Sequence, residues 1–290
     1  MSSSGPRPLT PDPGGPQGRL LLDGLVALDL TDLKGQLCGR LLADLGMQVI
    51  KVEPPGGDPV RQLGPFAGDG SRPHPEASLR FAHLNAGKQS LVLDLQQPAG
   101  RDLLLRLAEQ ADVVLESFAP GELERMGLGP QVLRQRNPRL VVTSVSGFGQ
   151  SGPHRDYLCP DIVGLAMGGL MYISGDADRP PVKAPETQSY YFACIYAALA
   201  TLLAVWQRSK DCQPRDVDVS IQEAIASQEH LIRAAGFDHK SIRRHGSQHE
   251  YVAPATIFPT QDGYVYLFVS RQHWRRHWPT LTLRSALWWS

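Results

Sequence analysis

The sequence has 290 residues, 42% of them hydrophobic and 20% charged, which is enough for a sizeable core in one large or two ordinary domains. The 29 basic and 29 acidic residues cancel, so no global field favours nucleic acid or an anionic membrane. The four cysteines form no CxxC pair and the nine histidines show no ligand spacing, which argues against a metal site or disulfide framework and favours a reducing cytosol.

Two stretches bear on where the protein resides. Residues 1–19 are rich in Pro, Gly and Ser, and they predict a disordered tail instead of a signal peptide or presequence. Residues 192–206, FACIYAALATLLAVW, carry no charge but fall short of the about twenty residues that cross a membrane. Polar residues flank this run on both sides, so we expect a buried helix in a cytoplasmic protein, with no membrane span.

Strands and helices alternate along the first half of the chain. Leu25–Leu30 is an apolar run typical of a buried strand, residues 35–46 have helical spacing, and residues 48–53 form the next strand. Such a unit predicts two parallel strands with a right-handed crossover. The alternation continues, which predicts an α/β fold with a doubly wound parallel sheet. Further strands are expected at 90–95, 112–117 and 139–149, and helices at 98–110, 120–127 and 130–138.

The pattern changes after Gly152. Asp262-Gly263 is a strong turn signal within 260–270, which predicts a hairpin at the beginning of a second domain. The end of the chain has four tryptophans and clustered arginines, as expected of a truncated or frame-altered terminus. Apolar helices are expected at 161–172, 189–208 and 221–235, and a short strand at 217–220. The expected division is a tail at 1–19, a large domain at 20–235 and a partial small domain at 236–290.

Common nucleotide and hydrolase signatures do not occur in the sequence. No GxGxxG or GxxxxGK[ST] follows the first strand, and no GxSxG elbow is found. The glycines of SVSGFGQSG suit either a ligand that approaches the backbone closely or a tight loop. Lys51, Arg61 and Lys88 lie in or beside loops, where they would either face a phosphate or be solvated.

Three aspartates are candidates for a catalytic carboxylate. Asp161 begins an apolar helix, and capping of that helix is the leading interpretation. Asp176 and Asp178 lie in SGDADRPP, where turn chemistry alone accounts for both residues. The residue types by themselves therefore favour structural roles for all three.

Several segments, in order along the chain, resemble a known family. They are LADLGMQVIKVEPPGGDPVR, LNAGKQSLVLDLQQPAGRDLLLRLAEQADVVLESFAPGELERMGLG, NPRLVVTSVSGFGQSGP, GGLMYISGDADRPPVK and VDVSIQEA. Together, over residues 20–270, they resemble the family III CoA-transferases (CaiB/BaiF), the carnitine and formyl CoA-transferase group that also includes the alpha-methylacyl-CoA racemases.

The resemblance implies a large Rossmann-like domain that binds CoA, a smaller second domain, and two ring-shaped subunits that interlock in a homodimer. It also implies transfer of CoA from an acyl-CoA to a free carboxylic acid, with CoA as a substrate and no separate cofactor. An aspartate would attack the thioester, and the reaction would proceed through a carboxylate anhydride and an enzyme-bound CoA thioester.

The position of the family's nucleophilic aspartate falls on Tyr190. In the family this aspartate follows a G-P-P turn and stands just before a long apolar helix. Here Pro180-Pro181 match the turn, and both counting from the prolines and aligning the helix lead to Tyr190. Glu186, about one helical turn earlier, is the nearest carboxylate in sequence and the first candidate to replace the aspartate, ahead of Asp178.

The resemblance also implies where CoA would bind. Arg125 would pair with a phosphate of CoA, and Phe118 would lie beside adenine or pantetheine. Ala86, Gln89 and Gln96 stand where the family often has basic residues, which predicts weaker or rearranged phosphate binding. The implied CoA contacts are Leu33, Lys34, Pro54, Leu93, Ser117, Phe118, Ala119, Arg125, Val145, Ser146, Gly147 and Phe148.

Two other functions stay open from the sequence. A racemase of this fold needs an acid–base pair beside the thioester, but Cys159-Pro160-Asp161 stands where that branch has G-H-D, and its carboxylate position is again Tyr190. A CoA-binding or dimerisation protein that has lost catalysis would explain the missing aspartate and basic residues. CoA transfer is the leading hypothesis, narrowly ahead of the non-catalytic protein, because the family match is broad. Racemisation would have lost two residues where transfer has lost one.

Overall fold

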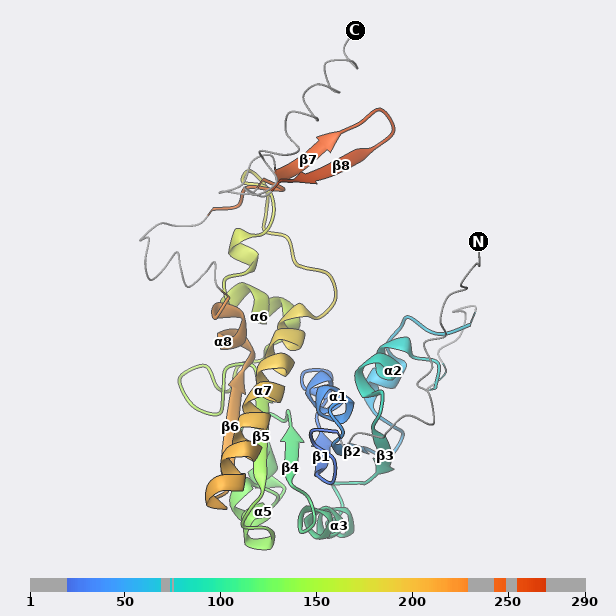
Figure 1. Ribbon diagram of the computed structural model, residues 1–290, viewed down its shortest axis with the longest axis vertical. Helices are drawn as coiled ribbons and strands as arrows, with labels where there is room; N and C mark the ends of the chain where they lie inside the picture. The colour runs from blue at the N-terminus through green and yellow to red at the C-terminus, as the bar shows by residue number, and fades with distance from the viewer. Residues whose placement is uncertain (1–19, 69–73, 75, 229–242, 249–254, 270–290) are drawn as a thin grey trace, which may run out of the picture.

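Figure 1 shows a computed structural model of the chain, which describes residues 20–68, 74, 76–228, 243–248 and 255–269. Its centre is a six-stranded sheet in which every neighbouring pair of strands is parallel. The order β3-β2-β1-β4-β5-β6 is that of a Rossmann-like doubly wound sheet, which confirms the predicted fold class. The strands are β1 (Val26–Leu30), β2 (Gln48–Glu53), β3 (Gln89–Val92), β4 (Val113–Glu116), β5 (Val141–Ser146) and β6 (Arg215–Ser220).

Helices connect these strands and cover the sheet (Figure 1). Short α and 3-10 segments lie between the longer helices. The helical elements are α1 (Gln36–Asp44), η1 (Pro59–Gln62), α2 (Leu79–Asn85), α3 (Pro98–Ala108), α4 (Glu122–Arg125), α5 (Pro130–Arg136), α6 (Asp161–Met167), η2 (Met171–Ile173), α7 (Gln188–Asp211) and α8 (Ile221–Ala226).

The core consists of two clusters, one on each face of the sheet. Successive strand residues point to opposite faces, so Val141 and Val142 belong to different clusters. One cluster packs β1, β4 and β5 against α1 and α7. The other packs the opposite face of these strands against α3, α4 and α5. Burial on both faces explains why the strands read as continuous apolar runs in the sequence.

α7 lies along the sheet beside β5 and β6, as Figure 1 shows. It is long and apolar enough to cross a membrane by length and composition, but half of its apolar window is buried inside the protein. Thr143 of β5 and Thr201 of α7 share a hydrogen bond of 2.8 Å. Near the end of the helix, Arg208 pairs with Asp112 at 2.8 Å. The structure thus confirms the helix expected at 189–208 and packs it on the sheet.

Most expected elements agree with the structure to within a few residues, but three end earlier than expected and two are additional. The strand expected at 90–95 ends at Val92, and the helix expected at 221–235 ends at Ala226. The helix expected at 161–172 ends at Met167 and is followed by Gly168 and Gly169, the latter with φ +92, before η2 begins. η1 and α2 were not expected, because each is too short to produce a clear hydrophobic period.

The hairpin expected around Asp262-Gly263 is present. It consists of β7 (Ala255–Pro259) and β8 (Tyr264–Phe268), which form an antiparallel sheet of their own. In Figure 1 this hairpin lies apart from the six-stranded sheet. The division into a large and a small domain stays a prediction. The tail expected at 1–19, residues 229–235 of the helix expected at 221–235 and the unusual terminus lie outside the described residues.

Candidate active site

A cavity of about 230 Å³ lies at the carboxyl edge of the sheet, where β1 and β4 are neighbours and the strand order reverses. Chains leave β1 and β4 in opposite directions at such a switch point, which leaves a crevice for a ligand. Pro54, Leu93 and Phe118, all implied CoA contacts, line this cavity. The structure therefore brings together residues from the ends of three strands that are far apart in sequence.

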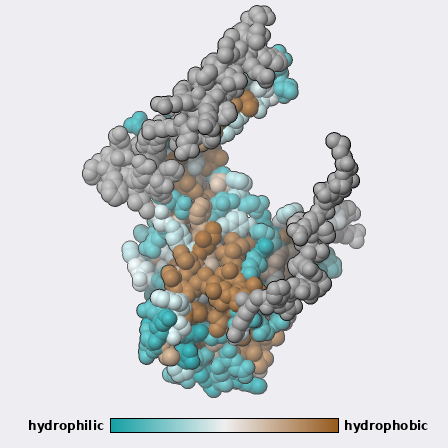
Figure 2. Space-filling view, viewed as in Figure 1, coloured by the Kyte–Doolittle hydropathy of each residue, from teal (hydrophilic) through white to brown (hydrophobic). Residues whose placement is uncertain are grey.

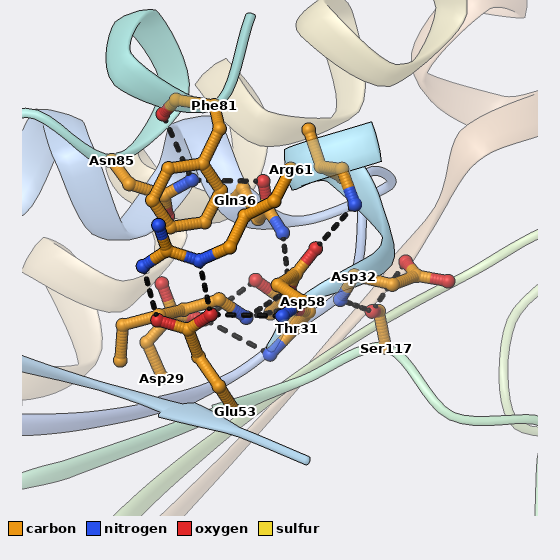
Figure 3. A network of polar contacts seen from close by, with 12 residues as sticks. Asp29, Thr31, Asp32, Gln36, Glu53, Asp58, Arg61, Phe81, Asn85 and Ser117 are labelled. Atoms are coloured by element: carbon orange, nitrogen blue, oxygen red, sulfur yellow. Dashed lines mark hydrogen bonds and ion pairs between the residues drawn. The ribbon is translucent and has the colours of Figure 1, made fainter. Parts of the chain in front are cut away.

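Two further implied contacts, Lys34 and Ser117, lie at the same strand ends. The Ser117 hydroxyl donates to Asp32 Oδ1 at 2.8 Å and accepts from the Asp32 amide at 2.8 Å, as Figure 3 shows. Lys34 Nζ lies 2.7 Å from Asp32 Oδ2, and both side chains are partly exposed. Arg125 is exposed at the end of α4, next to Met126 of the cavity wall. Both cations are accessible to a phosphate, and their role in binding it stays a prediction.

A buried polar network lies at this cavity (Figure 3), and three of its residues, Lys51, Glu53 and Asp58, line the cavity. Lys51 pairs with Asp58 at 2.9 Å, and Arg61 makes two hydrogen bonds to Glu53, at 2.7 and 2.8 Å. Burial alone would raise the pKa of Glu53, but hydrogen bonds from Arg61, Ser90 and the Asp58 amide lower it to about 2. These charges are already neutralised inside the protein.

Lys88 completes the network against α1. Its ammonium lies 2.7 Å from Asp29 Oδ2, and the two side chains are 1% and 0% exposed. A side chain at Gly39 would lie 2.4 Å from Asp29 Oδ2, so only glycine lets α1 approach this pair. The prediction that Lys51, Arg61 and Lys88 either face a phosphate or are solvated is wrong, because all three are buried and paired with carboxylates.

The remaining implied CoA contacts are less accessible or lie elsewhere. Leu33 is partly buried against the core, and Val145 and Ser146 are 1% and 2% exposed within β5. The space that a side chain at Gly147 would need is occupied by Cys159, whose Cβ would be 2.3 Å away. The glycine after β5 therefore admits a neighbouring loop of the same chain. Phe148, partly buried, contacts His154 and Tyr157 edge-on.

Ala119 lines a second cavity of about 220 Å³ beside β4, β5 and β6. Glu116 also lines it and is 4% exposed, and its Oε2 accepts the backbone N–H of Phe118 at 2.8 Å. Burial raises the pKa of Glu116 to about 7. Glu116 was not among the residues predicted from the sequence. The one sequence feature that pointed to it is a charged residue at the end of an apolar strand.

Tyr190, the residue that the sequence predicts at the position of the family's aspartate, is the third residue of α7. Its side chain is 8% exposed, and its hydroxyl donates to the carbonyl of Cys159 at 3.1 Å. Burial raises the pKa of Tyr190 well above its ordinary value, so the phenol stays neutral. The residue packs and anchors a loop, and it offers no anionic nucleophile at neutral pH.

Asp161 holds the beginning of α7 in place. Its Oδ1 accepts the amide and the hydroxyl of Ser189, at 2.9 and 2.8 Å, and its Oδ2 lies 2.7 Å from Lys183 Nζ. It makes no side-chain capping bond to α6, the helix that it begins. The expectation that Asp161 caps its own helix is therefore wrong, since the cap is made to the following long helix, 28 residues away.

Glu186 lies just before α7 in a left-handed backbone conformation, with φ 59. This conformation is costly for a non-glycine residue, so contacts must hold it. Lys183 Nζ donates to the Glu186 carbonyl, and Arg80 Nη2 lies 2.6 Å from Glu186 Oε2. The carboxylate side chain is still 52% exposed. The sequence analysis had identified neither Lys183 nor Arg80 as partners of this residue.

The turn at Asp176 and Asp178 lies on the surface. Both residues are exposed, and Asp176 lies 3.7 Å from Arg179 in an i,i+3 pair. Gly175, with φ +110, provides the left-handed conformation that this turn needs. The structure thus brings Glu186, and not Asp178, into contact with residues of other elements.

The sequence profile of CoA-transferase family III matches residues 22–286. The chain belongs to this family. Among solved structures, a CaiB/BaiF family protein from Brucella suis has a TM-score of 0.79 and 32% identity, over 87% of this chain and 67% of that one. The resemblance stated from the sequence is therefore confirmed for the family and for the fold.

Relatives within CoA-transferase family III are enzymes named for the acids they act on. Succinyl-CoA–D-citramalate CoA-transferase of Chloroflexus aurantiacus is 41% identical over 83% of this chain and 60% of its own length. Acetyl-CoA:oxalate CoA-transferase of Acetobacter aceti is 36% identical over 86% and 63%. Subunit BbsE of the succinyl-CoA:(R)-benzylsuccinate CoA-transferase of Thauera aromatica is 37% identical over 83% and 58%. The chain thus spans about three fifths of the length of these relatives.

Proposed function

We propose that this chain transfers CoA from an acyl-CoA to a free carboxylic acid and that Glu186 is the nucleophile. The observation that carries the proposal is the geometry of Glu186, a half-exposed carboxylate held beside α7 in a strained backbone by Lys183 and Arg80. A solvent-accessible carboxylate oriented by neighbouring cations is placed to attack a thioester. The family membership of the chain supports the reaction class.

The proposed reaction consists of two symmetric halves. Glu186 Oε attacks the acyl carbon, the C–S bond breaks, and the electron pair leaves on sulfur as CoA thiolate. The thiolate then attacks the Glu186 carbonyl carbon of the resulting anhydride, which releases the donor acid and leaves a glutamyl-CoA thioester. The acceptor acid attacks this thioester to form a second anhydride, and the thiolate returns to the acceptor's acyl carbon and frees Glu186. The anhydrides keep the acyl groups activated throughout.

In this proposal CoA is a substrate and binds at the switch-point cavity. Leu93, Pro54 and Phe118 would provide an apolar surface for the adenosine or pantetheine part. Lys34 and Arg125 would meet the phosphates, because both are accessible there, unlike Lys51, Arg61 and Lys88. We further propose a cytoplasmic setting, where acyl-CoA and the free acids are available.

A second copy of the chain is proposed as the partner. Figure 2 shows an apolar patch over α7, where Ile195, Leu199, Leu203 and Trp206 are between 54% and 62% exposed. Contiguous apolar surface of this kind marks interfaces more often than free surface. Light scattering during size-exclusion chromatography should give twice the chain mass, and Leu203→Glu should shift the protein towards a single chain.

A non-catalytic CoA-binding subunit is the second candidate function. The observation that favours it is Tyr190, buried and hydrogen-bonded at the position of the family's aspartate. The name of the relative from Thauera aromatica, a single subunit of its enzyme, supports the same alternative. Racemisation has less support, because Pro160, whose side chain cannot act as a base, stands where that branch has its histidine.

The nucleophile is tested by trapping the intermediate. After addition of an acyl-CoA, hydroxylamine should convert Glu186 to a hydroxamate that peptide mass spectrometry locates, and Glu186→Ala should lower transfer by about 1,000-fold or more. Asp178→Ala is the matched control and should keep full activity. Full activity of both variants would remove Glu186 from the reaction.

Two other measurements test the alternative functions. CoA binding by calorimetry without turnover over a panel of acids would favour the non-catalytic subunit. Exchange of the α-hydrogen for deuterium without an acceptor acid would favour the racemase.

A further inference from the structure

Arg80 reaches Glu186 from α2 and is held at two points. Its Nη2 lies 2.6 Å from Glu186 Oε2, and its Nε donates to the carbonyl of Gly64 at 3.2 Å. The arginine side chain is 20% exposed and the glutamate side chain 52% exposed. The guanidinium is therefore fixed in orientation while the ion pair stays open to solvent and to a ligand.

The proposed reaction changes the charge balance of this pair. In both anhydrides and in the glutamyl-CoA thioester, the Glu186 carboxyl group is covalently bonded to an acyl group or to sulfur and carries no negative charge. Lys183, the other cation that contacts this segment in the described part of the chain, stays neutralised, because Asp161 lies 2.7 Å away and is 7% exposed. Arg80 is thus the cation that loses its partner when Glu186 is acylated.

We propose that Arg80 determines specificity by binding the second carboxylate of dicarboxylic substrates, both as CoA esters and as free acids. This inference rests on the proposed function of Glu186. A planar guanidinium binds a carboxylate through two parallel hydrogen bonds, which a lysine cannot reproduce. A monocarboxylic substrate of the same length would form no such charge-assisted hydrogen bonds with the guanidinium. The site therefore selects dicarboxylates over their monocarboxylic analogues.

A comparison of kcat/KM for two CoA esters tests the proposal. Succinyl-CoA and butyryl-CoA have the same carbon chain and differ in the terminal carboxylate. The wild-type chain should use succinyl-CoA roughly 10- to 100-fold more efficiently in kcat/KM, and Arg80→Gln should abolish this preference. Arg80→Lys should retain part of it. Arg40→Gln removes another arginine that contacts α2, at His83, and should leave the ratio unchanged.

A binding experiment tests the same proposal without turnover. Glu186→Gln replaces the carboxylate by a neutral amide of the same shape and thereby reproduces the charge of the acylated enzyme. By calorimetry, succinate should bind this variant at least roughly tenfold more tightly than wild type, and succinamide, which has the same carbon chain without a carboxylate, should not. Adding Arg80→Gln to Glu186→Gln should remove the gain.

The outcomes separate this inference from the function on which it rests. The proposed function would be contradicted if neither ester supported CoA transfer and hydroxylamine trapping gave no hydroxamate at Glu186. Transfer in which Arg80→Gln slows both esters equally would contradict the role of Arg80 and leave the function intact. Equal succinate affinities of wild type and Glu186→Gln would also overturn the role of Arg80, whether or not the chain turns over.

Discussion

Two groups of paired charges in this chain differ in how deeply they are buried. In the network beside the switch-point cavity, Lys88 and Asp29 are 1% and 0% exposed. Beside α7, Arg80 and Glu186 are 20% and 52% exposed. Buried charges require their partners permanently, because separation would leave a desolvated ion. The half-exposed pair can exchange partners at little cost, because water replaces what is lost.

This difference in burial indicates a structural role for one group and a catalytic role for the other. The buried pairs join β1, β2 and the loops after them, and thereby shape the wall of the cavity. Their cations are unavailable to a ligand. The region before α7 instead holds a carboxylate and a guanidinium that a substrate can reach. Chemistry is therefore expected at the second region and shape at the first.

The largest expected effect is on stability, at the buried pair. Asp29→Asn should lower the free energy of unfolding by about 3–5 kcal/mol, because it leaves the Lys88 charge buried without a counter-ion. Urea unfolding followed by circular dichroism measures it. Glu186→Gln, the matched change in the exposed pair, should cost less than about 1 kcal/mol. Similar losses for both variants would remove the distinction between the two regions.

The next effect is a pH dependence at Glu116. Burial raises its pKa from 4.5 to about 7, so the folded protein binds this proton more tightly than the unfolded chain does. Its contribution to stability is present in full below pH 4.5 and is lost as the pH rises through 7. Glu116→Gln should not show this loss. Its free energy of unfolding should therefore rise relative to that of wild type, by up to about 3 kcal/mol, between pH 4.5 and pH 8.

Thermal unfolding across that pH range checks the prediction for Glu116. Glu109→Gln, an exposed carboxylate at the end of α3, is the control and should keep the wild-type slope. A Glu116→Gln profile parallel to wild type would mean that Glu116 is ionised throughout the range.

The smallest expected effect is that of Tyr190→Phe on stability and transfer activity. Tyr190→Phe removes the hydroxyl that donates to the Cys159 carbonyl and should cost about 1 kcal/mol of stability. Transfer activity should stay within about threefold of wild type, since a neutral phenol takes no covalent part. A 100-fold loss of activity without a matching loss of stability would place Tyr190 in the chemistry.

The roles of individual charged residues depended on contacts that no local pattern encodes. Asp161 looked like the cap of its own helix, yet its partner is Ser189, which α7 brings to it. Lys51 lies in β2 and Arg61 in η1, on either side of a loop rich in proline and glycine, yet both are buried and paired, Lys51 with Asp58 and Arg61 with Glu53. The residue types of this segment suggest binding but do not reveal that its charges neutralise one another.

The sequence by itself determined the α/β class, most strands and helices, and the family, because these depend on local periodicity and on residue order. The assignment of the family's aspartate position to Tyr190 stays a prediction. Tertiary structure alone decided the strand order, the joining of three strand ends around one cavity, the raised pKa of Glu116 and the pairing of Glu186 with Arg80. Burial and charge pairing depend on residues distant in sequence, so they follow only from the folded chain.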